Sequence, residues 1–195
     1  MNATVAAPSL GTKPSQWQID PAHSAAHFSV RHLMISNVRG EFTKVSGHAV
    51  LDPSEPTKSS LEVVIDATSI NTREPQRDEH LRSADFLEVA NHQTITFRSK
   101  KITPAGQEHY KVTGDLTIRG TTREVTFDVE GPTQPVKDPY GNVRTGVSAT
   151  AKINRKDFGL VWNALTEAGG IMVGDEVSLG FEAELIQQSA AAGTK

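Results

Sequence analysis

Apolar and polar residues alternate along most of this chain, which is the pattern of strands with one buried and one exposed face. Residues 110–118 show it clearly, since Val112 and Leu116 share one face while Lys111 and Thr113 share the other. The same alternation predicts strands over residues 27–32, 61–67, 94–98, 124–130, 147–154 and 177–185. Residues 41–51 form a less regular strand, which we expect to bend at Gly47.

Short turn sequences separate the predicted strands. Asp52-Pro53 and Arg119-Gly120 are typical turn signals, so we expect neighbouring strands to pair antiparallel. About eight strands with one apolar face each predict an all-β fold, an extended antiparallel β-barrel whose interior has room for side chains or one slim ligand. A sandwich of two sheets is the competing architecture.

Two segments interrupt the alternation. Pro75 favours the first turn of a helix, so one short helical segment is predicted near residues 75–87. Residues 155–174 contain Trp162 and are interpreted as a long loop with one helical turn. Loops of this length in a compact domain are often functional.

Length and composition favour a single soluble domain. We expect a barrel domain over residues 16–186, with flexible tails at 1–15 and 187–195 because these ends are small and polar. The net charge of −3 argues against a nucleic-acid binder. The chain has no Cys, no apolar run of membrane-spanning length and no signal-peptide pattern. We therefore predict a cytoplasmic protein; a periplasmic one from which a signal peptide had been removed would look the same.

Few residues suggest catalysis or metal binding. The motifs of nucleotide binding, zinc proteases and serine hydrolases are absent. His23, His27 and His32 are close in sequence, but on a strand His27 and His32 point to opposite faces, so we expect no metal site. Asp78 and His80 suit general acid–base chemistry, yet the sequence places no nucleophile beside them.

Basic residues gather in the two segments that interrupt the strands. Arg77, His80 and Arg82 belong to the helical segment, and Arg155 begins the long loop. Salt bridges that anchor these segments are one interpretation. Recognition of an anionic head group is the other, because a guanidinium binds phosphate or carboxylate in a bidentate manner.

The inward-facing positions mix large and very small side chains. Phenylalanines at 28, 97, 127 and 181 share the interior with Gly114, Ala149, Ala151 and Ala183. Tight complementary packing and an open apolar channel both fit this mixture. In a channel, an acyl or isoprenoid chain would gain about 0.8 kcal/mol per buried methylene.

Six stretches in order resemble the YceI-like family over roughly residues 17–186. They are WQIDPAHSAAHFSVRHLMISNVRGEF at 17–42, SSLEVVIDATSINTREPQRDEHLRSADFLEV at 59–89, TITFRSK at 94–100, KVTGDLTIRGTTREVTFDV at 111–129, INRKDFGLVWN at 153–163 and GDEVSLGFEAEL at 174–185. The resemblance implies a bacterial protein with a lipocalin-like barrel and a long apolar channel for polyisoprenoid or other amphipathic chains. Phe86-Leu87 and Val45 stand where aromatic residues are common in the family.

The leading hypothesis is therefore a lipid carrier or sequestering protein that is not an enzyme and needs no cofactor. Its ligand would be a polyisoprenoid, an isoprenoid quinone or a fatty-acid-like lipid. Arg77, His80, Arg82 and Arg155 are candidates for the head group. The residues expected to line the channel or cover its mouth are Phe28, Val30, His32, Ile95, Phe97, Leu116, Phe127, Ala149, Ala151, Trp162 and Phe181.

Two further hypotheses remain open from the sequence. One is an enzyme that acts on an isoprenoid-like substrate, with His32 or the Asp78/His80 pair as the acid–base group. The other is a stress-related structural domain with a filled core, which would dimerise through strand edges or loops. Roles in transport or stress response, and a homodimer, follow from these hypotheses as expectations.

Overall fold

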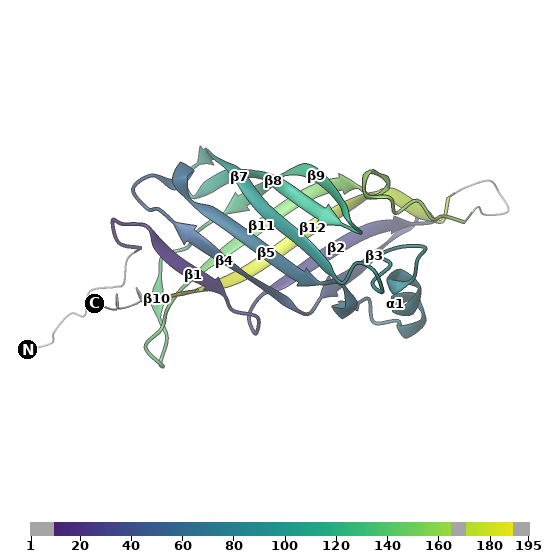
Figure 1. The fold of residues 1–195 in the computed structure, drawn as a ribbon, viewed down its shortest axis with the longest axis horizontal. Helices are drawn as coiled ribbons and strands as arrows, with labels where there is room; N and C mark the ends of the chain where they lie inside the picture. The colour runs from purple at the N-terminus through teal and green to yellow at the C-terminus, as the bar shows by residue number, and fades with distance from the viewer. Residues whose placement is uncertain (1–9, 165–170, 189–195) are drawn as a thin grey trace, which may run out of the picture.

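A computed structural model describes residues 10–164 and 171–188 of the chain. Within these residues the chain forms twelve strands of one sheet and one α-helix (Figure 1). The strands are β1 (Ser15–Ile19), β2 (Ala25–His32), β3 (Ser36–Phe42), β4 (Val45–Leu51), β5 (Ser60–Asp66), β6 (Ile70–Asn71), β7 (Thr94–Gly106), β8 (His109–Ile118), β9 (Thr121–Glu130), β10 (Val136–Lys137), β11 (Val143–Asn154) and β12 (Val173–Gln187). The helix is α1 (Pro75–Arg82), and the 3₁₀ turns are η1 (Pro56–Lys58), η2 (Ala67–Ser69) and η3 (Arg155–Phe158).

Eight of these strands close into an antiparallel barrel. The pairing runs β11–β9–β8–β7–β5–β4–β1–β12, and β12 pairs again with β11 from Arg144↔Ile186 to Asn154↔Glu176. On its other edge β12 pairs with β2 over Val173–Glu182 and then with β1 over Leu185–Gln187. Strands β2, β3 and β6 therefore extend the wall beyond the ring, toward the end where α1 lies (Figure 1). This confirms the predicted all-β, lipocalin-like class with a single helical segment.

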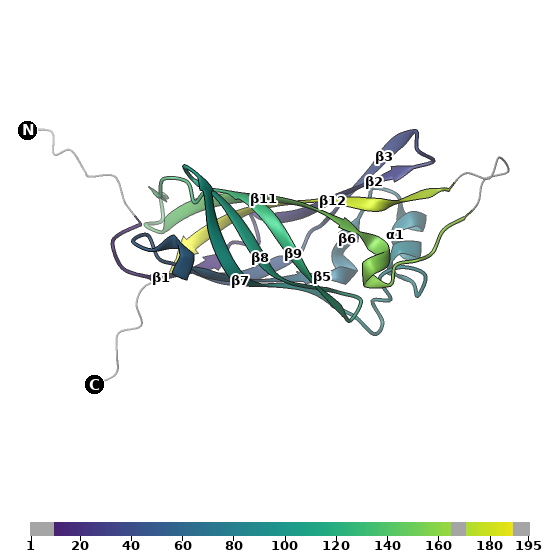
Figure 2. The ribbon, with the colours of Figure 1, turned by 90° about the horizontal axis from the view of Figure 1, so that it is seen from above.

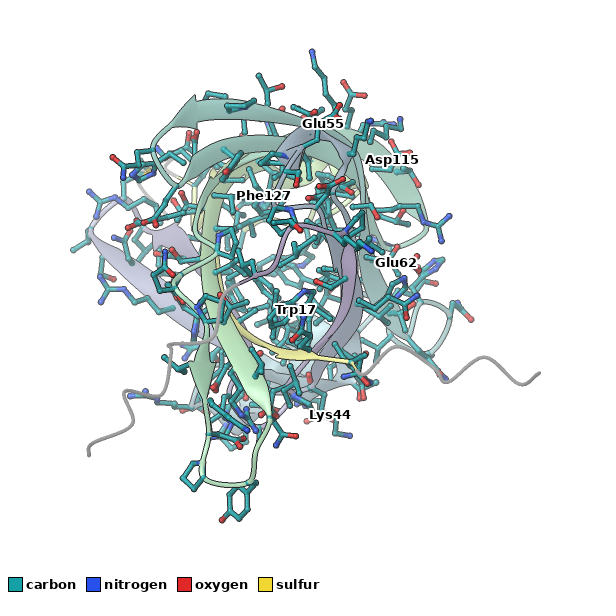
Figure 3. All side chains as sticks on the ribbon, turned by 90° about the vertical axis from the view of Figure 1, so that its left-hand side faces the viewer. Trp17, Lys44, Glu55, Glu62, Asp115 and Phe127 are labelled. Atoms are coloured by element: carbon teal, nitrogen blue, oxygen red, sulfur yellow. The ribbon has the colours of Figure 1, made fainter. Side chains whose placement is uncertain are left out.

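The sequence pattern explains the wall. On β8 the side chains of Val112, Leu116 and Ile118 are buried, while Lys111 faces solvent and pairs with Asp128 of β9. Seen along the barrel, Trp17 and Phe127 point inward, whereas Lys44, Glu62 and Asp115 lie on the outside (Figure 3). Burial of one face of each strand is the main source of stability here, since apolar burial contributes about 25 cal/mol per Å².

Several boundaries differ from the sequence-based expectation. The strand expected at 41–51 is interrupted at Thr43 and Lys44, so it is divided between β3 and β4. Ser15 and Gln187, which we expected in the tails, belong to β1 and β12. The remaining tail residues 1–9 and 189–195 lie outside the described residues. The helix ends at Arg82, and a turn brings Phe86 and Leu87 back to the barrel.

Candidate functional site

The interior of the barrel holds an apolar cavity of about 240 Å³, here called the main cavity. It lies toward the α1 end, and its lining includes side chains of Leu81, Phe86 and Leu87 from α1 and the turn after it. A dry apolar cavity of about 150 Å³ is already large enough to bind benzene. Predicted channel residues that line it are Phe28, Val30, Ile95, Phe97, Leu116, Phe127, Ala149 and Phe181.

Three predicted channel residues are not part of this lining. His32 ends β2, where it pairs with Ser36 and with Val173. Ala151 pairs with Leu179 and shares the face of Ala149 without reaching the cavity surface.

Trp162, the third of these residues, lies one layer outside the cavity. Its ring packs on Phe86 with 5.3 Å between ring centroids, and Phe86 itself lines the cavity. The His80 ring contacts both Phe86 and Trp162 edge-on. Trp162 therefore packs behind a lining residue, and its role in covering the mouth of the cavity stays a prediction.

Other lining residues were not singled out from the sequence. Most of them occupy the inward positions of the predicted strands, so the alternation itself could have identified them; they include Val63, Ile65, Val112, Val129, Val147, Ile153, Val177 and Leu179. Those contributed by the short strand β6 and by η3 with the segment after it carried no such signal, because only tertiary packing brings Ile70, Phe158 and Leu160 to the barrel.

Polar contacts clamp α1 onto the barrel. Asp78 is buried and accepts hydrogen bonds from the backbone N–H and the hydroxyl of Thr72, at 2.8 and 2.5 Å. Arg82 donates to the carbonyls of Thr68 and Ile70, and Arg77 donates to the hydroxyl and carbonyl of Thr72. These donors are directed at the protein; a role of Arg77 or Arg82 at a lipid head group stays a prediction.

The acid–base pair considered from the sequence is not formed. Asp78 is occupied by Thr72, and the Nε2 atom of His80 lies 2.8 Å from a carboxylate oxygen of Asp85. Neither His80 nor Asp85 lines the main cavity. A contact of His80 with a ligand head group stays a prediction.

Arg155 is the buried charge at the main cavity, with 4% of its surface exposed. Its guanidinium donates to the carbonyls of Leu160, Trp162 and Gly174 at 2.5 to 2.9 Å, and more weakly to Val173. Burial lowers the pKa of Arg155, and the nearby Asp175 carboxylate opposes that shift. Arg155 therefore holds the segment after η3 against the start of β12, and its role as a head-group ligand stays a prediction.

A second cavity of about 260 Å³ occupies the opposite end of the barrel. Its lining contains more polar residues, among them His48, Asp52, Glu108, Tyr110 and Gln134. Six residues line both cavities and are here called the waist: Leu61, Val63, Val112, Val129, Val147 and Phe181. The interior is therefore a two-chambered space and not a filled core.

One cluster of the described residues has the spacing of cation ligands. Ligand atoms of Asp20, His23 and Glu184 lie within 4.8 Å of one another. The guanidinium of Arg144 already provides the positive charge, at 2.5 Å from Asp20, 2.7 Å from Asp138 and 3.4 Å from Glu184. Its hydrogen bond lowers the pKa of Asp20 from 3.8 to about 2. This cluster is an ion-pair network that joins the β1–β2 connection to β11 and β12.

Together, the closed antiparallel ring and the apolar chamber define a lipocalin-like barrel that can enclose a slender apolar molecule. The YceI-like domain family matches residues 17–185, and the chain belongs to that family. The UPF0312 protein SA2479 of Staphylococcus aureus is 37% identical over 170 residues, which cover 87% of this chain and 96% of that protein.

Solved structures show the same fold. BcnA of Burkholderia cenocepacia matches with a TM-score of 0.72 and 25% identity, over 85% of this chain and 98% of that one. The YceI protein of Campylobacter jejuni matches with a TM-score of 0.67 and 31% identity, over 82% and 90%. A polyisoprenoid-binding domain from Saccharophagus degradans matches with a TM-score of 0.64 at 16% identity, over 88% and 98%, which concerns the fold alone. None of these names is that of an enzyme. Among the described residues, no helix combines the length and apolarity needed to cross a membrane.

Proposed function

We propose that this protein binds one long-chain amphipathic lipid inside the barrel and carries or sequesters it. The observation that carries the proposal is the main cavity, which is lined mainly by aliphatic and aromatic side chains. Such a chamber favours the hydrocarbon part of a ligand, because each buried methylene contributes about 0.8 kcal/mol. Polyisoprenoids, isoprenoid quinones and fatty-acid-like chains share this chemistry.

Two facts support a chain over a compact ligand. The two cavities share the apolar waist residues, so we expect an occupant longer than the main cavity to extend past them into the second cavity. The polar residues beyond the waist, such as Tyr110 and Gln134, suit a hydrated or polar end of the same molecule. The domain from Saccharophagus degradans is described as polyisoprenoid-binding, which agrees with this use of the fold.

We propose no catalytic step. The groups first considered for acid–base chemistry, His32, Asp78 and His80, do not line the main cavity. A carrier needs only affinity, a route of entry and exclusion of water.

The test begins with native mass spectrometry of the freshly purified protein, followed by organic extraction of any bound molecule. A stoichiometric long-chain species would support the proposal and would reveal its chemical class. If the protein is empty, titration with stearic acid and with an isoprenoid quinone follows. Absence of binding to every chain offered would contradict the proposal.

A pair of variants on β11 then locates the ligand. Ala149→Phe places a ring in the main cavity, whereas the neighbouring Thr150 is exposed on the outer face, so Thr150→Phe is the matched control. Displacement of about two methylenes at ~0.8 kcal/mol each predicts a loss of affinity slightly above tenfold for Ala149→Phe. Thr150→Phe should bind as the unmodified protein does. Equal binding by both variants, with unchanged melting temperatures, would place the ligand elsewhere.

A further inference from the structure

The hairpin between β2 and β3 projects from the barrel at the α1 end, opposite the described chain ends (Figure 2). Three consecutive apolar residues form its tip, and their surfaces are exposed by 36% for Leu33, 61% for Met34 and 79% for Ile35. The N–H of Leu33 donates to the carbonyl of Met172 at 2.8 Å, which places the exposed Ile171 beside them. We call Leu33, Met34, Ile35 and Ile171 the apolar tip.

The backbone of this turn does not favour the residues it carries. Leu33 and Met34 both have positive φ angles, of 50° and 58°, and the N–H of Ile35 donates to the carbonyl of His32. Two consecutive residues with positive φ in a tight hairpin turn are the conformation that favours Asn and Gly. Large side chains are disfavoured there, so neither turn geometry nor burial accounts for Leu33 and Met34.

On the hairpin, the charged residues closest to the apolar tip are both positive, and the acidic Asp175 and Glu176 of the neighbouring β12 are already paired with Lys156 and Lys152. Arg31 and Arg39 lie exposed on the two strands of the hairpin, and within the described residues neither forms an ion pair. The nearest acidic residue on the hairpin, Glu41, lies further from the tip and is 3.8 Å from His27. Apolar side chains flanked by free arginines match a lipid surface, where the chains enter the interface and the cations meet anionic head groups.

The apolar tip also adjoins the cavity. Val30 and Val173 line the main cavity. Both stand at the base of the tip, since Val30 lies on β2 just before Leu33, and Val173 directly follows Met172 and pairs with His32. We propose that this tip docks on the surface of an anionic lipid bilayer and brings the main cavity to the membrane. The inference rests on the proposed function in one respect: a lipid carrier has to meet the bilayer that supplies or accepts its cargo.

Vesicle flotation of the full chain tests the proposal, with vesicles of phosphatidylcholine alone and with one part in three of phosphatidylglycerol. Met34→Ser/Ile35→Ser is the tip variant. Val136→Ser/Tyr140→Ser is the matched control, because these residues are also exposed, by 59% and 90%, at the other end of the barrel. We expect the tip variant to lose at least about tenfold in vesicle partitioning, and the control to lose nothing.

Arg31→Gln/Arg39→Gln tests the charge. Binding to the anionic vesicles should fall by about fivefold for each arginine, with no change on neutral vesicles. Failure of the unmodified protein to bind anionic vesicles would overturn the proposal, and so would an equal loss in the control variant. A dimer in the absence of vesicles that the tip variant abolishes would identify the tip as a protein interface and would also overturn it.

The result is separable from the proposed function. The tip variant should bind stearic acid in vesicle-free solution as the unmodified protein does. Ala149→Phe should bind stearic acid about tenfold more weakly and still float with vesicles. If neither the unmodified protein nor any variant binds stearic acid, the result contradicts the proposed function. An unmodified protein that binds stearic acid but no anionic vesicles would contradict only the docking proposal.

Discussion

The two ends of the barrel are held together by different kinds of polar contact. At the α1 end a buried guanidinium, Arg155, binds main-chain carbonyls, and the Phe86 and Trp162 rings pack on each other. At the end that carries the described chain ends, Arg144 binds carboxylates, and the second cavity there has more polar residues in its lining. The comparison shows that the arginine of one end neutralises main-chain oxygens beside an apolar cavity, whereas the arginine of the other end forms ion pairs.

Blocking the waist should have the largest effect of the changes considered, because it divides the two cavities from each other. Val129 lines both cavities, so Val129→Phe places a ring between them. Exclusion of about four methylenes at ~0.8 kcal/mol each predicts a loss of roughly 100-fold or more in affinity for stearic acid. Octanoic acid, which fits on one side of the waist, should bind nearly as before. Titration calorimetry with both acids measures the difference.

The outer-face variant Thr126→Phe on the same strand is the control, since Thr126 is exposed. An equal loss for the short and the long acid in Val129→Phe would show that the waist does not divide the ligand site.

Replacing Arg155 and Arg144 in separate variants compares how much each end of the barrel contributes to the free energy of unfolding. Arg155→Met leaves the carbonyls of Leu160 and Gly174 without their donor in a buried position, which we expect to cost about 2–3 kcal/mol of the free energy of unfolding. For a chain of this size that corresponds to a melting temperature lower by roughly 4–12 °C. Urea unfolding of both this variant and Arg144→Met gives the comparison.

Arg144→Met should lose less. The carboxylate of Asp138 keeps hydrogen bonds from Tyr140 and Asn142, and that of Asp20 keeps one from the N–H of Ala22. If Arg144→Met proves to be the less stable variant, the ion pairs of Arg144 contribute more to stability than the hydrogen bonds of Arg155 to main-chain carbonyls.

Acid should destabilise the end of the barrel that Arg144 holds by ion pairs. We expect this effect to be smaller than those of blocking the waist and of replacing the arginines. The pKa of Asp20 is lowered from 3.8 to about 2 in the folded protein, mainly by its hydrogen bond with Arg144. Because a lowered pKa stabilises the fold above the unfolded value, this contribution is complete above pH 4 and is lost as the pH falls toward 2. The guanidinium of Arg155 does not titrate in this range.

The free energy of unfolding of Asp20→Asn should therefore depend less steeply on pH between 4 and 2 than that of the unmodified protein. Some slope remains, because Asp66 and Glu88 also have lowered pKa values, through hydrogen bonds from Thr68 and Asn91. An unchanged slope in urea titrations at pH 4, 3 and 2.5 would show that Asp20 is not a source of acid sensitivity.

Strand parity made the wall of the cavity predictable. On a strand every second side chain faces the same way, so Phe97, Leu116 and Phe127 could be assigned to the interior without coordinates. The same rule placed Ala151 inward but could not show that it stays out of the cavity lining. Gly114 shows that a small inward residue need not mark open space. A Cβ there would lie 2.7 Å from the Phe97 ring, so this glycine allows close packing.

The sequence by itself determined the β-class, the antiparallel order of short-linked strands, the helical segment and the inward faces, since these depend on local alternation and turn residues. Only the tertiary structure decided where β11 meets β12 to close the barrel, and how the interior divides at the waist. It also decided that Arg77, Arg82 and Arg155 point at main-chain oxygens, and that Leu33 and Met34 remain exposed. These outcomes depend on contacts between residues far apart in the chain, which no local pattern specifies.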